Sequence, residues 1–300
     1  MILHKHKTQY IVRSGGETMS ANVSPLRYPG GKAKLYSYVR ELLCANNLLG
    51  ETYMEPFAGG CGLALKLLLN GDVKRIIIND LDPAIHSFWY CVLNETDALC
   101  HLIKSTPITP SEWRKQKAIY MNGLQNNILE YGFATFFLNR TNVSGVLMGG
   151  MIGGESQTGT YKIDARFNRS ELVERIKEIA KYKNAIILTN LDAKELLSAD
   201  NLKRYYKVFI NLDPPYVKKG RQLYKNAFTL ADHKELCSII SHCRRKWIVT
   251  YDVCDFISSL YGQYRSSYLN INYSVRGNRK AKEYIFFSNN LKLPSGIDLR

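Results

Sequence analysis

The sequence predicts an α/β protein with a mostly parallel sheet of seven strands and an inserted module. Short apolar, β-prone runs alternate along the chain with helix-like runs, as in parallel sheets that are covered by helices on both faces. A glycine-rich turn joins the first strand to a helix, and acidic residues follow several of the strands. Both features are typical of nucleotide-binding α/β sheets.

The first unit is a strand, a glycine loop and a helix. Residues 53–57 form the expected strand, Ala58-Gly59-Gly60-Cys61-Gly62 the loop, and residues 63–69 the helix. The next strand, residues 75–80, ends in Asp80. Its distance from the glycine loop is about the 20 residues expected for a carboxylate that binds ribose hydroxyls.

Further strands and helices continue this alternation. The strands are predicted at residues 185–191, before Asp192, at 206–212, before Asp213, at 247–251, and as a final pair at 264–273 and 283–288. Helices are predicted over residues 34–46, 83–94, 170–182 and 231–244, the last with a capping-box-like start at Thr229 to Asp232.

The alternation breaks between residues 95 and 169, which we interpret as an inserted target-recognition module. Helices are expected near 111–121 and 126–138, and a glycine-rich segment follows, with residues 161–167 as the return strand of a hairpin. A surface loop without a function is the alternative. The predicted organisation is a loose tail at 1–22, a catalytic domain of 23–94 and 170–300, and the module.

The amino-acid composition limits the classes of protein to which the chain could belong. The chain has 300 residues, of which 45% are hydrophobic, and a net charge of +15, which favours a polyanionic partner such as nucleic acid. Its seven cysteines include no C-x-x-C pair, which argues against a disulfide framework and a zinc site, and no metal is expected. No run approaches the roughly 20 apolar residues of a membrane span, and the first residues lack the apolar region of a signal peptide. We expect a cytoplasmic protein.

Asp213-Pro214-Pro215-Tyr216 directly follows an apolar strand. Asp213 offers a carboxylate and Pro214 a carbonyl in a stiff turn, because proline fixes its own backbone angle. Tyr216 offers a ring for stacking. This set suits methyl transfer to the exocyclic amine of a nucleobase, and a strand that simply ends in a proline turn is the alternative.

Three motifs follow one another along the chain: Arg27-Tyr28-Pro29-Gly30-Gly31-Lys32, then Glu55-Pro56-Phe57-Ala58-Gly59-Gly60-Cys61-Gly62, and last Asp213-Pro214-Pro215-Tyr216. This ordered set resembles the Dam-type (D12 class) DNA adenine-N6 methyltransferases over nearly all of residues 24–290. The resemblance implies a Rossmann-like sheet, S-adenosylmethionine (SAM) as cofactor, and double-stranded DNA as substrate, with the target adenine flipped out of the helix.

The resemblance also implies roles for matching positions. Asp213, Pro214, Pro215 and Tyr216 would be catalytic, with Asp213 and the Pro214 carbonyl accepting the two amine hydrogens and Tyr216 stacking on the base. The cofactor would contact Tyr28, Lys32, Glu55, Phe57, Gly59, Gly60, Asp80, Asp192 and Asp213. Lys32 would face the methionine carboxylate, Asp80 the ribose hydroxyls and Asp192 the adenine amine.

For DNA, Arg140 and Asn142 match the start of the family's recognition segment. Beyond Gly145 the chain departs from the Dam pattern, so a GATC target is not implied. Two basic runs could contact phosphates, and solvated loops are the alternative for each; their members are Lys218, Lys219, Arg221, Lys225, Arg276, Arg279 and Lys280.

Other functions remain open at this point. Another amine could be the target, such as cytosine N4, an RNA base or a protein glutamine, or the chain could be a catalytically silent DNA-binding protein on the same fold. Asp at the head of the catalytic motif favours adenine, and a silent binder would not need Asp213, Tyr216, Lys32 and Asp80 together. A monomer is the default expectation, with a dimer on DNA as the alternative.

Overall fold

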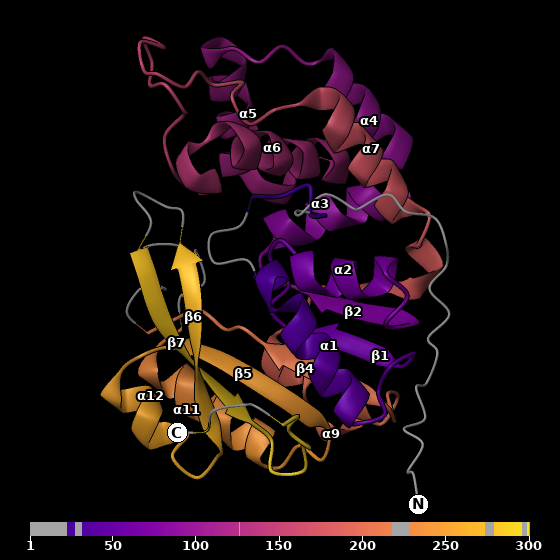
Figure 1. The fold of residues 1–300 in the computed structure, drawn as a ribbon. Helices are drawn as coiled ribbons and strands as arrows, with labels where there is room; N and C mark the ends of the chain where they lie inside the picture. Colours follow the sequence, from indigo (N-terminus) through magenta and orange to yellow (C-terminus); the bar gives the residue numbers. More distant parts are fainter. Residues whose placement is uncertain are drawn as a thin grey trace, which may run out of the picture.

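A seven-stranded sheet organises the chain in the computed structural model, which describes residues 23–27, 32–125, 127–217, 228–273, 279–295 and 299. The strand order is β3-β2-β1-β4-β5-β7-β6 (Figure 1). Strands β1 to β5 pair in parallel, and the β6–β7 hairpin joins β5 antiparallel. The predicted mostly parallel sheet of seven strands is confirmed. The strands are β1 (Thr52–Glu55), β2 (Arg75–Asn79), β3 (Ile186–Thr189), β4 (Val208–Leu212), β5 (Lys246–Asp252), β6 (Ser266–Tyr273) and β7 (Arg279–Phe287).

The central strands are buried on both faces, which explains their continuous apolar sequences. Every residue of β1 and of β4 is buried. Successive side chains point to opposite faces of a strand. Thus Tyr53 and Phe209 join one hydrophobic cluster, whereas Met54 and Ile210 join the other.

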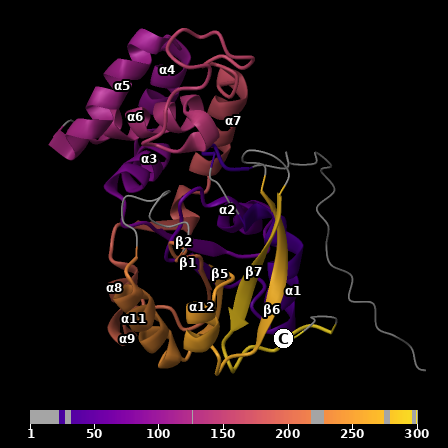
Figure 2. The ribbon, with the colours of Figure 1, turned by 90° about the vertical axis from the view of Figure 1, so that its left-hand side faces the viewer.

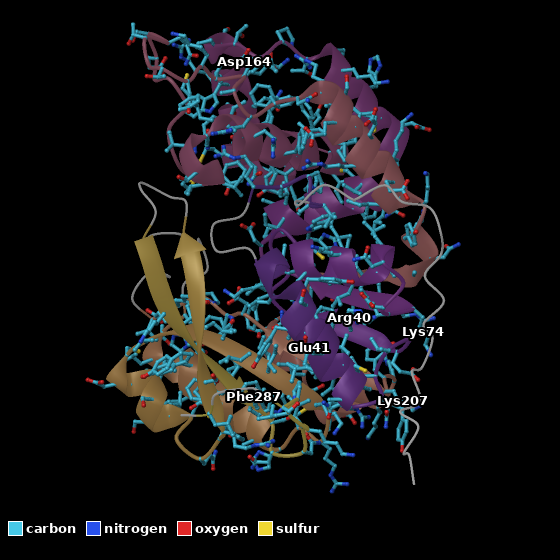
Figure 3. The ribbon with its side chains drawn as sticks, in the orientation of Figure 1. Arg40, Glu41, Lys74, Asp164, Lys207 and Phe287 are labelled. Carbon is cyan, nitrogen blue, oxygen red and sulfur yellow. The ribbon has the colours of Figure 1, made fainter. Side chains whose placement is uncertain are left out.

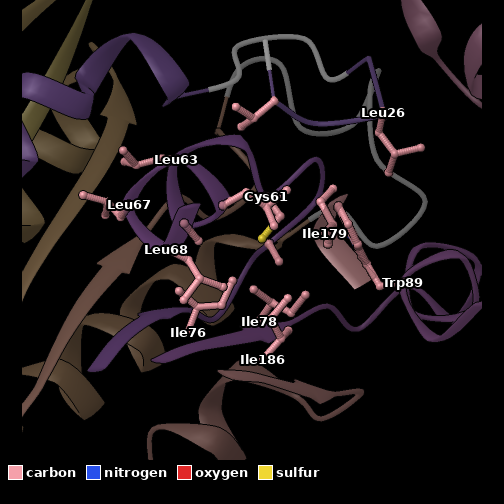
Figure 4. Packing of buried hydrophobic residues seen from close by; sticks show 14 of the residues in the cluster. Leu26, Cys61, Leu63, Leu67, Leu68, Ile76, Ile78, Trp89, Ile179 and Ile186 are labelled. Atoms are coloured by element: carbon pink, nitrogen blue, oxygen red, sulfur yellow. The ribbon is translucent and has the colours of Figure 1, made fainter. Parts of the chain in front are cut away.

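Helices cover the two faces of the sheet. On one face lie η1 (Lys32–Leu35), α1 (Tyr36–Ala45) and α2 (Gly62–Leu69), and on the other α8 (Ala193–Leu196), α9 (Ala199–Leu202), α11 (Leu230–Ser241) and α12 (Asp255–Leu260). Figure 4 shows Leu67 and Leu68 of α2 above Ile76 and Ile78 of β2. The predicted capping box of α11 is present, because Thr229 and Asp232 each accept a hydrogen bond from the other's backbone N–H.

The remaining helices form a module at one end of the molecule (Figures 1 and 2). It comprises the helices of the predicted segment 95–169, which are α4 (Thr96–Ser105), α5 (Pro110–Asn122), η2 (Gly123–Gln125), α6 (Ile128–Thr141) and η3 (Val143–Gly145), together with the flanking α3 (Pro83–Asn94) and α7 (Arg169–Ala180), whereas η4 (Lys183–Ala185) leads into β3. In both views α3 lies between the sheet and the other module helices. Helix α6 packs on α3 and α5, and α7 packs on α4. The helices predicted at 111–121 and 126–138 correspond to α5 and α6, while α4 was not predicted.

The predicted hairpin return strand at 161–167 is wrong. Residues 163–166 form turns, closed by the bonds from Ala165 N to Lys162 O (3.0 Å) and from Phe167 N to Asp164 O (2.8 Å). In a β-hairpin the backbone N–H of Ile163 would donate to a neighbouring strand. Here it donates to the side chain of Gln157, with 2.8 Å between Ile163 N and Gln157 Oε1. Among the described residues, no strand therefore pairs with this segment.

Ion pairs brace the edge of the sheet at which β1 begins. The Glu51 carboxylate, just before β1, lies 2.9 Å from Lys74 Nζ and 3.2 Å from Lys207 Nζ. These two lysines precede β2 and β4, and Figure 3 shows them near each other, far from Asp164 in the module. Part of the chain's positive charge is thus paired here, on the opposite side of the sheet from the strands' carboxyl ends.

Candidate active site

Acidic side chains follow the carboxyl ends of neighbouring parallel strands. Glu55 ends β1, Asp80 follows β2, Asp192 follows β3 and Asp213 follows β4. The chain runs outward from β1 through β2 to β3 and then returns to place β4 on the other side of β1. Ligands of open α/β sheets bind outside the strand ends at such a switch point. The site is therefore at the end of β1 and β4.

The glycine loop is held against Asp80. Gly59 N donates to Asp80 Oδ2 at 2.8 Å, and Asp82 N donates to Asp80 Oδ1 at 3.0 Å. Gly59 and Cys61 have φ values of 45° and 53°, in the left-handed region that favours glycine. Burial raises the pKa of Asp80 to about 6, although the two backbone hydrogen bonds oppose the rise. Asp80 can accept further hydrogen bonds from hydroxyl groups with its remaining lone pairs.

Asn79 fixes the distance between the loops that follow β1 and β3, and sequence reasoning gave it no separate role. Its side chain is buried and donates to Pro56 O at 2.9 Å and Leu191 O at 3.0 Å, while its oxygen accepts from Leu191 N at 2.9 Å. Next to it, Asp192 caps α8 by accepting from Lys194 N at 2.8 Å. Capping occupies one oxygen of Asp192, and the half-buried side chain retains its other lone pairs.

Glu55 lies inside the protein at the end of β1. Tyr53 Oη donates to Glu55 Oε1 at 3.1 Å. Burial raises the pKa of Glu55 to about 8, and the nearby Asp213 adds to the rise, against hydrogen bonds from Tyr53 and Asn211. Glu55 is thus mainly protonated at neutral pH. A neutral acid here avoids a second buried negative charge close to Asp213.

Asp213 is oriented by three polar groups that converge on one oxygen, of which Thr250 and Lys32 donate to it and Tyr216 shares its single hydroxyl hydrogen between Asp213 and Glu283. Its Oδ1 lies 2.7 Å from Thr250 Oγ1, 3.0 Å from Tyr216 Oη and 3.1 Å from Lys32 Nζ. Its Oδ2 has no hydrogen-bond partner within the part of the chain that the structure describes, and the side chain is 28% exposed. The arrangement presents one oxygen to a ligand while the other anchors the carboxylate.

Lys32 lies at the centre of a buried polar cluster. Its Nζ lies 2.8 Å from Tyr216 Oη and 3.1 Å from each of Asp213 Oδ1 and Glu283 Oε2. Burial alone would lower the pKa of Lys32, but the two carboxylates outweigh it and the pKa is raised. Lys32 is therefore charged at neutral pH, with three acceptors within hydrogen-bonding distance of its three N–H groups.

The catalytic-motif turn is anchored by neighbouring strands. Tyr216 Oη lies 2.7 Å from Glu283 Oε2 of β7, and Val217 N donates to Asp252 Oδ1 of β5 at 3.2 Å. The Tyr216 ring packs near Tyr251, with centroids 6.2 Å apart. Pro214 is buried and Pro215 is half-buried. The turn is thereby fixed to β5 and β7 as well as to its own strand.

Phe57 forms part of an aromatic wall beside this turn. Its ring meets Phe228 edge to face, with centroids 5.7 Å apart. Phe228 in turn contacts His233, which also bonds to Tyr251 with 2.9 Å between Nδ1 and Oη. The apolar surroundings lower the pKa of His233, so the wall is neutral at physiological pH.

The side chains of Arg140 and Asn142, the two candidate DNA contacts in the module, form hydrogen bonds within the protein. Arg140 Nε donates to Arg166 O at 2.6 Å, and burial, with Arg27 nearby, lowers the pKa of Arg140 to about 9. Asn142 is 0% exposed, accepts from Trp113 Nε1 at 2.6 Å and donates to Val146 O at 2.8 Å. Asn142 thus organises the loop after α6, and its side chain is not placed at the surface.

Other predicted contacts have no described side chain. Tyr28, Lys218, Lys219, Arg221, Lys225 and Arg276 lie outside the described residues, as does the tail at 1–22. Arg279 and Lys280 begin β7, and their side chains are outside the described part of the chain. The site that the structure does assemble contains Lys32, Glu55, Gly59, Asp80 and Asp213.

Sequence reasoning missed three residues that hold the site together: Thr250, Asp252 and Glu283. The signal for Glu283 was its position as a lone acid within a basic run. Thr250 and Asp252 belong to β5 and carry no motif that marks them.

In the part of the chain that the structure describes, the geometry gives neither a metal centre nor a membrane span. Within the described ranges, no three His, Cys, Asp or Glu side chains gather where they could hold a metal ion. None of the helices in those ranges has the length and apolar character needed to cross a bilayer.

Comparison with known proteins identifies the family. The profile of the D12 class N6 adenine-specific DNA methyltransferases matches residues 28–276. The chain belongs to this family. A D12 class assignment agrees with the resemblance carried by the three motifs.

The individual proteins that resemble this chain share little sequence identity with it. The type II methyltransferase M.MjaIII of Methanocaldococcus jannaschii is 26% identical over 226 residues, which cover 70% of this chain and 74% of that protein. Among solved structures, PH1948 of Pyrococcus horikoshii has a TM-score of 0.41 at 10% identity, covering 88% of this chain and 87% of its own. The rRNA methyltransferase aviRa of Streptomyces viridochromogenes has a TM-score of 0.37 at 13% identity, covering 87% and 85%.

Proposed function

We propose that this D12 class protein transfers a methyl group from SAM to the N6 amine of an adenine flipped out of duplex DNA. The observation that carries the proposal is Asp213, whose Oδ1 is anchored by Thr250, Tyr216 and Lys32 while Oδ2 is left to a ligand. An amine hydrogen is the kind of donor that such an oxygen accepts.

The residues present fit SAM. Asp80 suits ribose hydroxyls, and Gly59 beside it has no side chain to obstruct a ligand. Lys32 is charged and suits the methionine carboxylate, for which it would exchange one of its present partners. Asp192 suits the adenine amine of the cofactor. SAM supplies a methyl group on a positively charged sulfonium, which makes metal or covalent catalysis unnecessary.

The residues of the chain would act by positioning. Asp213 Oδ2 and the Pro214 carbonyl would accept the two hydrogens of the adenine amine, which draws its lone pair out of the ring and aims it at the methyl carbon. The amine nitrogen would accept the methyl group that SAM supplies, with the thioether as leaving group, and the surplus amine proton would then pass to water. Tyr216 would stack on the base, and its ring is already held by Glu283.

Access requires that the adenine leaves the duplex. Asp213 is only partly exposed and lies in a turn anchored to β5 and β7, so a base paired inside a helix would not reach it. We further propose that Lys218, Lys219, Arg221, Lys225, Arg276, Arg279 and Lys280 contact DNA phosphates. The net charge of +15 supports this part of the proposal.

The experiment is methyl transfer from labelled SAM to duplex DNA, followed by mass spectrometry of the released nucleosides. We expect N6-methyladenine from the wild type, and none above background from Asp213→Ala. Asp200→Ala is the matched control, because Asp200 is an exposed acid paired with Lys203 on the surface. Labelled cytosine, RNA or protein in place of adenine would overturn the substrate assignment. Binding of DNA without any transfer would favour the catalytically silent alternative.

Phosphate contact is tested separately by the salt dependence of DNA affinity. Each phosphate contact contributes a slope of about −0.9 to log K against log salt. We expect a slope steeper than about −4 for the wild type, shallower by about 1 for each of Lys218→Ala and Arg221→Ala. Equal slopes in wild type and variants would refute contact by these two residues.

A further inference from the structure

Glu283 is a buried acid on a strand outside the parallel part of the sheet. It lies on β7, opposite Asp252 of β5 and Leu269 of β6, and its side chain is 2% exposed. A carboxylate is almost never fully buried unless it is paired. Two of its partners are site residues, since Glu283 Oε2 lies 2.7 Å from Tyr216 Oη and 3.1 Å from Lys32 Nζ.

Glu283 orients Tyr216 by accepting the hydrogen of its hydroxyl group. A phenol has one hydrogen to donate, and Tyr216 Oη faces both Glu283 Oε2 at 2.7 Å and Asp213 Oδ1 at 3.0 Å. The shorter bond is the one to Glu283. Tyr216 is thereby held from the side opposite its own backbone, and this fixes the ring that is proposed to stack on the base.

Glu283 also affects the charge of Asp213, because both carboxylates face the ammonium of Lys32. One ammonium, that of Lys32, lies 3.1 Å from two carboxylates. Without the Glu283 charge, Lys32 would neutralise Asp213 alone and weaken it as an acceptor. With it, the ammonium is shared, and the three groups together carry a net charge of −1, because two carboxylates face one ammonium.

We propose that Glu283 is a positioning residue of the methyl transfer: it holds Tyr216, shares Lys32 with Asp213, and supplies the negative charge that makes the site prefer the sulfonium cofactor over its thioether product. This inference rests on the proposed function for its chemistry. SAM carries a sulfonium and an ammonium against one carboxylate, whereas the product S-adenosylhomocysteine has lost the sulfonium charge. The negative charge of Glu283 therefore favours binding of the cofactor over binding of the product.

Glu283→Gln is the decisive variant, because it keeps the shape and an acceptor oxygen and removes only the charge. We expect calorimetry to show at least about a tenfold loss of SAM affinity, consistent with a buried charge interaction. The affinity for S-adenosylhomocysteine is expected to change by less than about threefold. In kinetics, kcat is expected to fall about tenfold or more with little change in the KM for DNA.

Asp72→Asn is a closely matched control. Asp72 is also a buried acid that binds a tyrosine and a cation, with Tyr36 Oη at 2.6 Å and Arg40 Nε at 2.8 Å, but its partners lie on α1 and outside the site. It is expected to lose thermal stability as Glu283→Gln does, while its kcat and its preference for SAM over the product stay within about twofold of wild type.

A double-mutant cycle with Tyr216→Phe tests whether Glu283 acts through Tyr216, and Tyr216→Phe by itself remains available if Glu283→Gln folds poorly. Because Glu283 acts partly through the Tyr216 hydroxyl, the two effects on kcat are expected to be less than additive.

An unchanged preference for SAM in Glu283→Gln, or an equal loss in Asp72→Asn, would overturn the inference, as would fully additive effects in the cycle. Ligand binding does not require adenine methylation. A wild type that binds SAM but leaves adenine unmodified would therefore refute the proposed function and still leave the Glu283 charge test decided by calorimetry.

Discussion

Thr250→Val removes one hydrogen bond from the candidate catalytic carboxylate and changes almost nothing else. Thr250 lies in β5, is fully buried, and places its Oγ1 2.7 Å from Asp213 Oδ1. Valine has nearly the same shape, so the sheet should accept it. The expected result is a slower enzyme that is folded, because Asp213 keeps its place in the turn but loses its shortest anchor.

The size of the effect follows from the kind of bond. A hydrogen bond to a charged group contributes about 1.5–3 kcal/mol. Asp213 Oδ1 keeps Tyr216 and Lys32 as neighbours at 3.0 and 3.1 Å, so the lower half of this range applies. A loss of about 1.5–2 kcal/mol in the transition state corresponds to a fall in kcat of about 10- to 30-fold.

The assay is single-turnover methyl transfer to duplex DNA with both substrates saturating, together with thermal unfolding. Thr135→Val is the control, because Thr135 is equally buried and its hydroxyl donates to Tyr131 O at 2.8 Å inside α6, away from the site. Its kcat should match that of the wild type. A Thr250→Val enzyme within about twofold of wild type, or an equal fall in the control, would refute the view that Thr250 orients Asp213.

Three further changes have defined outcomes. Asp213→Asn replaces an accepting oxygen with a donor and is expected to lower kcat by at least about 100-fold with the melting temperature retained; a fall of less than tenfold would contradict its role. The pKa of Glu55 is raised from 4.5 to about 8 by burial, so the folded protein keeps a proton that the unfolded chain releases, and stability falls as pH rises between these values. Glu55→Gln should remove this loss, and urea unfolding should favour the variant by on the order of a few kcal/mol more near pH 8 than near pH 5; an equal difference at both pH values would show that Glu55 is ionised throughout. Asn142→Ala leaves Trp113 Nε1 without its partner at 2.6 Å and should lower the unfolding free energy by about 1–3 kcal/mol, whereas a surface DNA contact would weaken DNA binding at unchanged stability.

The fold could be predicted because its signals are local. Continuous apolar runs and helix-like runs alternate along the chain, and a strand end places any acid that follows it at the same edge of the sheet. Asp80, Asp192 and Asp213 were found by this rule, and β2, β3 and β4 end just before them. The same local reasoning failed at residues 161–167, where period-two alternation is present but no strand of the described ranges pairs with the segment.

The hydrogen bonds and ion pairs that hold the site residues in place could not be predicted, because they join residues that are far apart in the sequence. Lys32 and Glu283 are 251 positions apart in the sequence, and Thr250 is 37 positions from Asp213. No periodicity or spacing rule relates such residues. Asn142 shows the converse, since a motif match suggested a DNA contact while the tertiary structure uses all of its polar atoms to shape the loop after α6.

The buried cluster also connects the stability of the fold to its chemistry. Lys32 comes from the first helical turn after the N-terminal segment, Asp213 from the middle of the chain and Glu283 from the last strand. Removing one member of a buried charged group leaves the others uncompensated, which costs about 3–5 kcal/mol. The start of η1, the end of β4 and strand β7 are thus held together by the same three side chains that surround the proposed reacting amine. Substitutions that neutralise one charge while keeping its shape, such as Glu283→Gln, therefore separate chemistry from folding better than truncations to alanine.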